Sequence, residues 1–188
     1  KPFCYAVCTA GDSIGKTIDT LNKCLQANHQ LQAMGISQPD SAYSLIMPES
    51  YVGLPFMDVD PSEKEKRKKE KAAQQLKAIC EDLRERKTGI SHLTEGPLPW
   101  FFTHIVGGFF EHVLITDKRF HVVEERCVKC GICANVCPVG DISGGKGKKP
   151  VWLHHDDCLT CFSCYHHCPH HAIEFGRQTQ KKGQYYYK

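Results

Sequence analysis

Two copies of one cysteine motif constrain this chain more than any other feature of its sequence. The motif C-x2-C-x2-C-x3-C-P runs from Cys127 to Pro138 and again, 31 positions later, from Cys158 to Pro169. The likeness continues past the cysteines, because C-P-V-G-D-I at 137–142 aligns with C-P-H-H-A-I at 168–173. The pattern therefore indicates an internal duplication of one metal-binding unit.

Four thiolates per site suit either a tetrahedral zinc ion or a [4Fe–4S] cluster. Zinc sites usually join two C-x2-C pairs from separate turns, whereas cysteines at i, i+3 and i+6 followed by Cys-Pro are typical of the loop around a cubane cluster. In this pattern we expect the fourth cysteine to open a short helix and to bind the other cluster. The predicted ligands are Cys127, Cys130, Cys133 and Cys168 for cluster 1, and Cys158, Cys161, Cys164 and Cys137 for cluster 2.

These motifs resemble those of bacterial-type two-cluster ferredoxins over about residues 117–176. The resemblance implies an α+β ferredoxin-like module in which electrons pass between two nearby clusters. The small residues Gly131 and Ala134 would let backbone N–H groups approach the sulfurs, and such hydrogen bonds help to set the reduction potential.

The first half of the chain has the pattern of a parallel sheet covered by helices. P-F-C-Y-A-V-C at 2–8 predicts a buried strand, apolar residues from Ile14 to Leu31 follow helical intervals until Gly35, and S-A-Y-S-L-I-M at 41–47 predicts a second strand. A strand–helix–strand order is typical of a parallel sheet. A charged helix is expected over 62–87, with Glu–Lys pairs that favour a solvated face over a docking surface.

Residues 98–115 form the most apolar segment of the chain. His104, Glu111, His112 and a Gly-Gly pair interrupt it, so we expect no membrane span. A helix packed between two domains, or at a subunit interface, fits the segment better. Residues 88–97 before it are expected to be a linker.

The whole chain resembles the family in which a flavodoxin-like domain precedes a two-cluster ferredoxin (EFR-type ferrodoxins). The sequences that carry this resemblance are F-C-Y-A-V-C, T-A-G-D-S-I-G-K-T, M-P-E-S-Y at 47–51, K-K-P-V-W at 148–152 and A-I-E-F-G-R-Q-T with K-K-G-Q-Y at 172–185. The resemblance implies a partial flavodoxin-like α/β domain, the C-terminal half of a doubly wound parallel sheet, followed by the α+β module. We expect the partial domain at 1–96, an apolar linker helix at 97–116 and the two-cluster domain at 117–188.

The glycine loop after the first strand has three interpretations: a nucleotide-binding loop, a flavin-binding loop, and a plain strand-to-helix turn that binds no ligand. A-G-D-S-I-G-K-T ends like a nucleotide-binding P-loop, but only three residues separate Gly11 from Gly15, where that motif needs four. By resemblance the loop lines the flavin ring of FMN, through Thr9, Ala10, Gly11, Asp12 and Ser13. The Ser/Thr-Gly-Thr-Gly-Asn phosphate loop of flavodoxins is absent from the chain, so we expect FMN in the intact protein and poor FMN binding by this chain.

Composition limits the remaining classes. A net charge of +3 and 41% hydrophobic residues describe a globular protein, and twelve cysteines without a secretory leader favour a reducing cytoplasm. The start at Lys1 suggests a fragment of a longer protein. The four cysteines outside the motifs are expected to be buried thiols: Cys4, Cys8, Cys24 and Cys80. Six histidines near the motifs are expected to be solvated, a second metal site being the alternative: His154, His155, His166, His167, His170 and His171.

We therefore expect an electron-transfer protein with two [4Fe–4S] clusters that relays electrons to or from a flavin and docks redox partner proteins, not nucleic acid. One alternative is a flavin-dependent reductase fed by the clusters. Another is an iron–sulfur redox sensor that docks a partner through the basic helix at 62–87.

Overall fold

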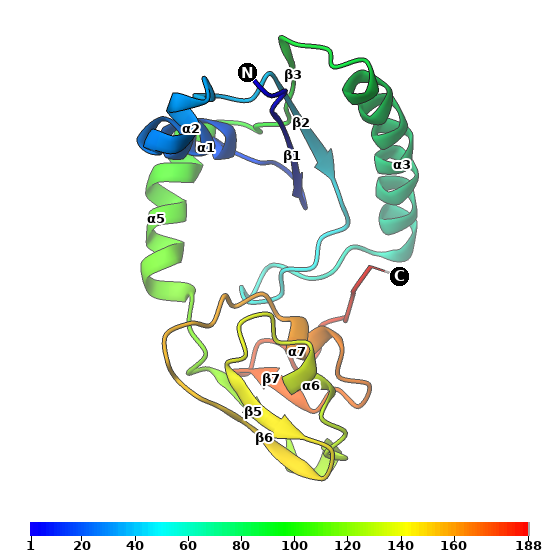
Figure 1. Cartoon of the computed structure of the whole chain (residues 1–188). Coiled ribbons are helices and arrows are strands. Elements are labelled where there is room, and N and C mark those ends of the chain that lie inside the picture. Colours follow the sequence, from blue (N-terminus) through cyan, green and yellow to red (C-terminus); the bar gives the residue numbers. More distant parts are fainter. Residues whose placement is uncertain (188) are drawn as a thin grey trace. The chain divides into compact units, whose positions relative to one another are not determined.

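The computed structural model describes residues 1–187 and divides the chain into two compact units (Figure 1). The first unit comprises Lys1–Glu49 and Asp60–Gly108, and the second unit comprises Ser50–Val59 and the chain from Phe109 onward. Each unit therefore combines two separate stretches of sequence.

The first unit is built on a parallel sheet with strand order β1-β2-β3. β1 pairs with β2 in parallel from Tyr5 opposite Ser41 to Ala10 opposite Ile46, and β2 pairs in parallel with β3. This pairing confirms the predicted strand–helix–strand arrangement. The expectation of a buried strand at 2–8 is wrong, because β1 lies at 5–10 and its residues alternate between exposed and half-buried, with Tyr5 53% exposed. The sheet does not by itself identify a flavodoxin-like half-domain. The elements are β1 (Tyr5–Ala10), α1 (Thr17–Ala27), α2 (His29–Ala33), β2 (Ser41–Ile46), α3 (Ser62–Arg84), β3 (Ile90–His92), α4 (Pro99–Phe101) and the π-helix η1 (Phe102–Val106).

Helices cover both faces of this sheet (Figure 1). Ile18 of α1 packs in a cluster with Ala42 of β2, whereas Ile79 of α3 packs with Tyr43 and Leu45 of the same strand. Successive side chains of a strand point to opposite faces, so the two clusters lie on opposite sides of β2. The charged helix α3 is thus confirmed, with an i,i+4 ion pair between Glu65 and Lys69 on its surface.

Three further expectations for the first unit are wrong in detail. The helix expected from Ile14 to Gly35 breaks at Asn28, whose side chain accepts hydrogen bonds from the backbone of Gln30 and Leu31 and so caps α2. The expected linker at 88–97 contains β3, which is too short for its periodicity to be recognised. Cys24 and Cys80, expected to be buried, are exposed, and Cys4 and Cys8 are only partly buried.

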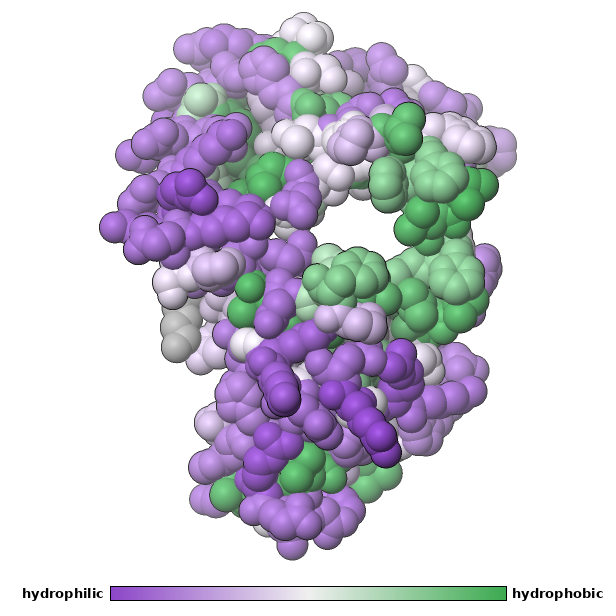
Figure 2. Space-filling model, turned by 180° about the vertical axis from the view of Figure 1, so that it is seen from behind, coloured by the Kyte–Doolittle hydropathy of each residue, from purple (hydrophilic) through white to green (hydrophobic). Residues whose placement is uncertain are grey.

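The apolar segment is helical from Pro99 to Leu114, with α5 (Gly107–Phe109) and a second π-helix, η2 (Phe110–Leu114). Its apolar side chains are largely at the surface, where Figure 2 shows hydrophobic residues gathered; Trp100 is 59% exposed and Phe109 60%. Among residues 1–187, no helix has both the length and the apolar character needed to cross a bilayer.

The second unit is small and rich in turns. β4 (Phe120–Val122) pairs with β7 (Ile173–Phe175), and β5 (Ile142–Gly145) pairs with β6 (Lys148–Trp152), both antiparallel. Short helices complete it: η3 (Glu124–Arg126), α6 (Ile132–Asn135) and α7 (Ser163–His166). The core is aromatic, because Phe162 and Phe175 are each 1% exposed and their ring centroids lie 5.1 Å apart, while Phe120 stacks on Trp152.

The stretch Ser50–Val59, defined here as the strap, belongs to the second unit although it lies between β2 and α3 in sequence. Val52 is fully buried in the aromatic core, and the Tyr51 ring packs 5.3 Å from that of Phe162. The Lys182 ammonium donates hydrogen bonds to the carbonyls of Val52 (3.1 Å), Met57 (2.6 Å) and Leu54. The strap is therefore tied to the last residues of the chain.

Candidate metal centre

The duplicated motifs form two copies of the same backbone path. In the first, Cys133 lies in α6, and in the second, Cys164 lies in α7. Each fourth cysteine follows its helix, so the expectation that it opens a helix is wrong. The chain turns instead within three residues of it, at positions with positive φ, namely Gly140 (φ 68°) and His171 (φ 46°).

Positive φ angles repeat at equivalent positions of the two motifs. Lys129 (φ 54°) corresponds to Thr160 (φ 47°), and Gly131 (φ 83°) corresponds to Phe162 (φ 59°), again 31 positions apart. Left-handed residues between right-handed ones turn successive N–H groups toward one side, a concave arrangement common at iron–sulfur sites. The duplication therefore preserves a strained backbone shape even where the side chains differ.

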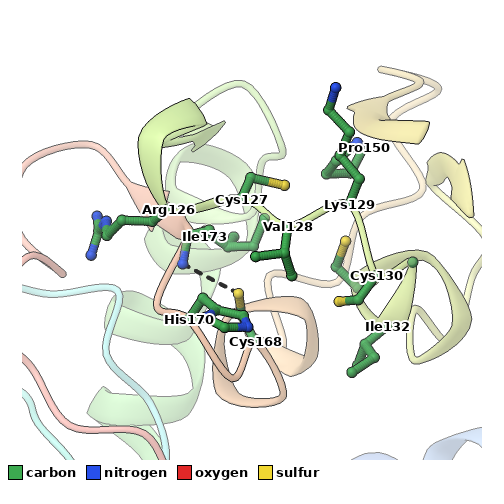
Figure 3. Close-up of a pocket in the computed structure, with 13 residues that line it drawn as sticks. Arg126, Cys127, Val128, Lys129, Cys130, Ile132, Pro150, Cys168, His170 and Ile173 are labelled. Carbon is green, nitrogen blue, oxygen red and sulfur yellow. Dashed lines mark hydrogen bonds between the residues drawn. The ribbon is translucent and has the colours of Figure 1, made fainter. Parts of the chain in front are cut away.

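The first loop surrounds a hollow, defined here as hollow 1 (Figure 3). Cys127, Cys130, Cys133 and Cys168 all line it, together with Ile132 and Ile173. In Figure 3 the labelled cysteines lie around one opening, while the Arg126 side chain points away. Three cysteines of the first motif are thus joined by the last cysteine of the second.

The second loop surrounds hollow 2 in the same manner. Cys158, Cys161 and Cys164 line it together with Cys137, the last cysteine of the first motif. The hollows are similar in size, with about 340 and 310 Å³ of empty space, part of it open to solvent. The structure therefore groups the eight predicted ligand residues into the two predicted sets of four.

The donor chemistry of both hollows fits an iron–sulfur cluster. All twelve cysteines are free thiols, and no cysteine of the motifs is in a disulfide. Within residues 1–187, no three His, Cys, Asp or Glu side chains converge as ligands of one metal ion; the motif cysteines are instead spread around the rims of the hollows. Polar backbone groups face the sulfurs, since Ala172 N–H donates to Cys168 Sγ (3.2 Å, the dashed line in Figure 3) and Thr160 N–H to Cys158 Sγ (3.4 Å).

Burial keeps the deeper thiols neutral. Burial raises the pKa of Cys133. The hydrogen bond from Ala134 N–H lowers this pKa, and the charge of the neighbouring Cys168 raises it further. Burial also raises the pKa of Cys164 well above its ordinary value, with Cys161 and Cys158 contributing further. Thiolates at these positions therefore need a bound cation, and metal binding would release protons.

Two buried carboxyl groups beside hollow 2 were not found from the sequence. Asp117 and Asp141 are 2% and 3% exposed, and Asp141 lines the hollow. Burial, followed by the negative charge of Asp117, raises the pKa of Asp141. Asp117 Oδ2 lies 2.7 Å from His154 Nδ1, an ion pair when that imidazole is protonated. No sequence signal distinguishes these aspartates from exposed ones in turns.

The histidines do not behave as one group. His166, expected to be solvated, is 5% exposed: its Nε2 bonds to Ser50 O of the strap (2.7 Å) and its Nδ1 accepts from Tyr185 N–H (3.1 Å). Burial lowers its pKa, and the ring links the strap to the C-terminal residues as a neutral group. His167 is partly buried, and the remaining four are exposed: His154, His155, His170 and His171.

The predicted flavin loop lies at the carboxyl end of β1. Thr9 and Ala10 end the strand, and Gly11, Asp12 and Ser13 follow it. Lys68 of α3 donates to Gly11 O (2.7 Å), and the carboxylate of Glu49 lies directly against Gly11. Lys68 also pairs with Asp60 (2.7 Å); burial alone would raise the pKa of Asp60, but hydrogen bonds from Lys64, Lys68 and the Glu49 amide lower it to about 2.

Two four-cysteine hollows in a duplicated α+β unit define an iron–sulfur protein. Residues 118–173 match the family described as the 4Fe-4S dicluster domain. This match, over part of the chain, supports a bacterial-type ferredoxin module.

Curated relatives agree. The chain is 33% identical to a ferredoxin of Streptomyces griseus over 70 residues, which are 36% of this chain and 65% of that protein. It is 54% identical to a ferredoxin of Megasphaera elsdenii over 28 residues, 15% of this chain and 52% of that protein. It is 34% identical over 53 residues to an uncharacterised protein of Porphyra purpurea; these residues are 26% of this chain and 71% of that protein. The chain thus spans between about half and seven tenths of each relative's length.

Proposed function

We propose that this chain is an electron carrier that holds two [4Fe–4S] clusters in its second unit. The observation that carries the proposal is the grouping of eight motif cysteines around two similar hollows in a module related to ferredoxins. The cubane cluster supplies one-electron chemistry when bound. Accordingly, the module would accept and release electrons one at a time.

We assign Cys127, Cys130, Cys133 and Cys168 to cluster 1, and Cys158, Cys161, Cys164 and Cys137 to cluster 2. The remaining residues of the chain would tune and protect these sites. Backbone N–H groups at Ala172 and Thr160 stabilise thiolate charge, and such hydrogen bonds raise reduction potential. The aromatic core around Phe162 excludes water from the inner side of the sites, which also acts on the potential.

The finer proposal is a relay between these clusters and a flavin in a longer protein, in a reducing cytoplasm and with redox proteins as partners. Its support is the sequence resemblance to flavodoxin–ferredoxin fusions and the position of Thr9–Ser13 at the carboxyl end of a parallel strand, where such sheets bind ligands. The missing phosphate loop predicts that FMN binds this chain weakly.

Anaerobic analysis of the purified chain for iron, acid-labile sulfide, zinc and flavin tests both parts. We expect about eight irons and eight sulfides per chain, a visible absorption bleached by dithionite, and little FMN. Stoichiometric zinc without sulfide would show that the hollows are zinc sites. Tight, equimolar FMN would contradict the weak flavin binding.

A further inference from the structure

The two hollows open beside surfaces of different charge. Four exposed lysines, defined here as the basic rim, lie near the mouth of hollow 1: Lys129, Lys146, Lys148 and Lys149. Lys129 lines the hollow itself. Lys146 lies in the turn between β5 and β6, and Lys148 and Lys149 begin β6. This hairpin is held against the cysteine loop because Gly147 N–H donates to Lys129 O (2.8 Å).

Most of this positive charge is not neutralised within the described chain. Lys149 pairs with Glu124, whose carboxylate also feels the charge of Lys129. Among residues 1–187, Lys129, Lys146 and Lys148 have no carboxylate within 4.0 Å. Glu125 is the other exposed acid next to this loop in sequence, so cations outnumber exposed acids by four to two.

The mouth of hollow 2 lacks such a rim. Residues 150–176 contain no lysine or arginine, and the position equivalent to Lys129 is the buried Thr160. Apolar side chains line this mouth instead, with Leu159 56% and Val139 39% exposed, and Asp156 and Asp157 are exposed nearby in sequence. The duplication therefore produced two similar hollows with opposite surroundings.

Cys130 is exposed at the mouth of hollow 1 and its counterpart Cys161 at that of hollow 2, so both mouths give electrons a short path and the basic rim is what distinguishes hollow 1. We propose that the basic rim is the docking surface for an acidic redox protein, which exchanges electrons at hollow 1. This proposal rests on the proposed function as an electron carrier. Charge complementarity is the basis, since clustered unpaired charges steer a partner of opposite sign and set its orientation. Electron-transfer complexes have small interfaces, so four lysines would make up a large share of the residues in such an interface.

An acidic protein fits this rim better than a nucleic acid does. Single strands bind where aromatic side chains stack on bases beside a basic groove. The exposed apolar side chain at this mouth is Val128, 59% exposed, and no Phe, Tyr or Trp lines hollow 1; His170 contributes the one aromatic ring in its lining. Lys129 of the rim also lines the same hollow as Cys130, a position that nucleic-acid binding does not require.

Binding of poly-L-glutamate to the cluster-loaded chain tests the surface without any electron transfer. We expect binding at about 20 mM salt that is lost near 200 mM, measured by fluorescence anisotropy of the labelled polymer. Lys146→Glu with Lys148→Glu should weaken binding about tenfold. The control, Arg177→Glu with Lys181→Glu, changes the net charge equally on exposed residues that do not line hollow 1, and it should weaken binding less than about twofold.

The rates of electron transfer to small charged oxidants show whether electrons leave the chain at hollow 1. The reduced chain is mixed with Co(EDTA)⁻ or Co(NH₃)₆³⁺; each Co(III) takes one electron and becomes Co(II), without proton transfer. The Lys146→Glu/Lys148→Glu variant should react more slowly with the anion and faster with the cation than the wild type, and the control should not. Lys146→Gln with Lys148→Gln should also slow the reaction with the anion and speed the reaction with the cation, but by a smaller factor.

Three results would overturn the proposal. These are equal loss of poly-L-glutamate binding in the control, unchanged rates with both cobalt complexes, or single-stranded DNA that binds more tightly than poly-L-glutamate through the same lysines. Iron and sulfide are measured in every sample, so failure of the cluster assignment is seen separately from failure of the docking surface.

Discussion

At the scale of single residues, the duplication conserves backbone conformation more strictly than side chains. Gly131 and Phe162 occupy equivalent positions with φ of 83° and 59°, yet one has no side chain and the other is the centre of the aromatic core. Left-handed conformation costs a non-glycine residue about 1 kcal/mol, which Phe162 offsets by complete burial. Gly131 has no comparable space: a Cβ there would lie 2.7 Å from Gly145 C and 2.8 Å from Lys146 N.

The substitution Gly131→Ala should therefore disrupt cluster 1. The added methyl group meets backbone atoms that cannot rotate away, so the cysteine loop and the β5–β6 turn must separate. We expect iron content to fall toward about four per chain, with one of two cluster signals lost from the EPR spectrum of the reduced protein.

Gly140→Ala is the matched control. Gly140 has φ of 68°, but a Cβ there meets nothing within 4 Å. The control thus carries the conformational strain without the collision, at a cost of about 1 kcal/mol. Equal iron loss in both variants would mean that strain, not close approach, explains the glycine at position 131.

Residue-level prediction from the sequence is strongest where chemistry sets the spacing, although the ligand role of the cysteines stays a prediction. Thiolates around a cube must follow a fixed interval, so the grouping of the eight motif cysteines could be predicted from the motif. Burial of a polar residue has no such pattern. His166 and Asp141 are buried because distant segments cover them, and only tertiary contacts reveal that.

At the scale of elements, the strap is the feature that no sequence pattern predicts. It lies within the predicted 1–96 region, and nothing in its composition indicates packing with residues after Phe109. The longer periodic elements β2 and α3 were predictable, whereas β3 is too short and α1 ends at a capping asparagine inside an apolar pattern. Sequence patterns predict structure formed by neighbouring residues. The strap is held instead by contacts between residues more than 100 positions apart in the sequence, such as the hydrogen bond from Gln178 to Gly53.

Lys182→Met should loosen the strap. Removing the ammonium leaves the carbonyls of Val52, Leu54 and Met57 without their donor, and buried unsatisfied groups cost about 1–3 kcal/mol each. We expect amide hydrogen exchange of residues 51–59 to accelerate at least about tenfold, while exchange in α3 stays unchanged.

The neighbouring lysine provides the control for the strap. Lys181 is exposed and has no bond to the strap among the described residues, so Lys181→Met should leave exchange unchanged. If Lys182→Met also leaves residues 51–59 protected, the core contacts of Val52 are sufficient and the ammonium is dispensable.

At the scale of the whole molecule, each cluster is expected to take ligands from both motifs. Cys137→Ser should then perturb the same EPR signal as Cys161→Ser, because both line hollow 2. Cys168→Ser should perturb the same signal as Cys130→Ser, because both line hollow 1.

Cys24→Ser serves as a control for the cysteine substitutions, since this exposed thiol of α1 lies outside both motifs and should leave both signals intact. The opposite pairing, with Cys137 and Cys130 affecting one signal, would show that each motif closes on itself. In that case the exchange of the fourth cysteine between motifs would be wrong.

The strap also sets an order of events during synthesis. Lys182 follows Val59 by 123 residues, and ribosomes add about 5–20 residues per second, so the strap waits roughly 6–25 s for its lysine. For most of that interval the aromatic core that Val52 enters is incomplete, because Phe162 and Phe175 follow Val59 by 103 and 116 residues. The second unit is therefore completed only after residues through Lys182 have been added to the chain.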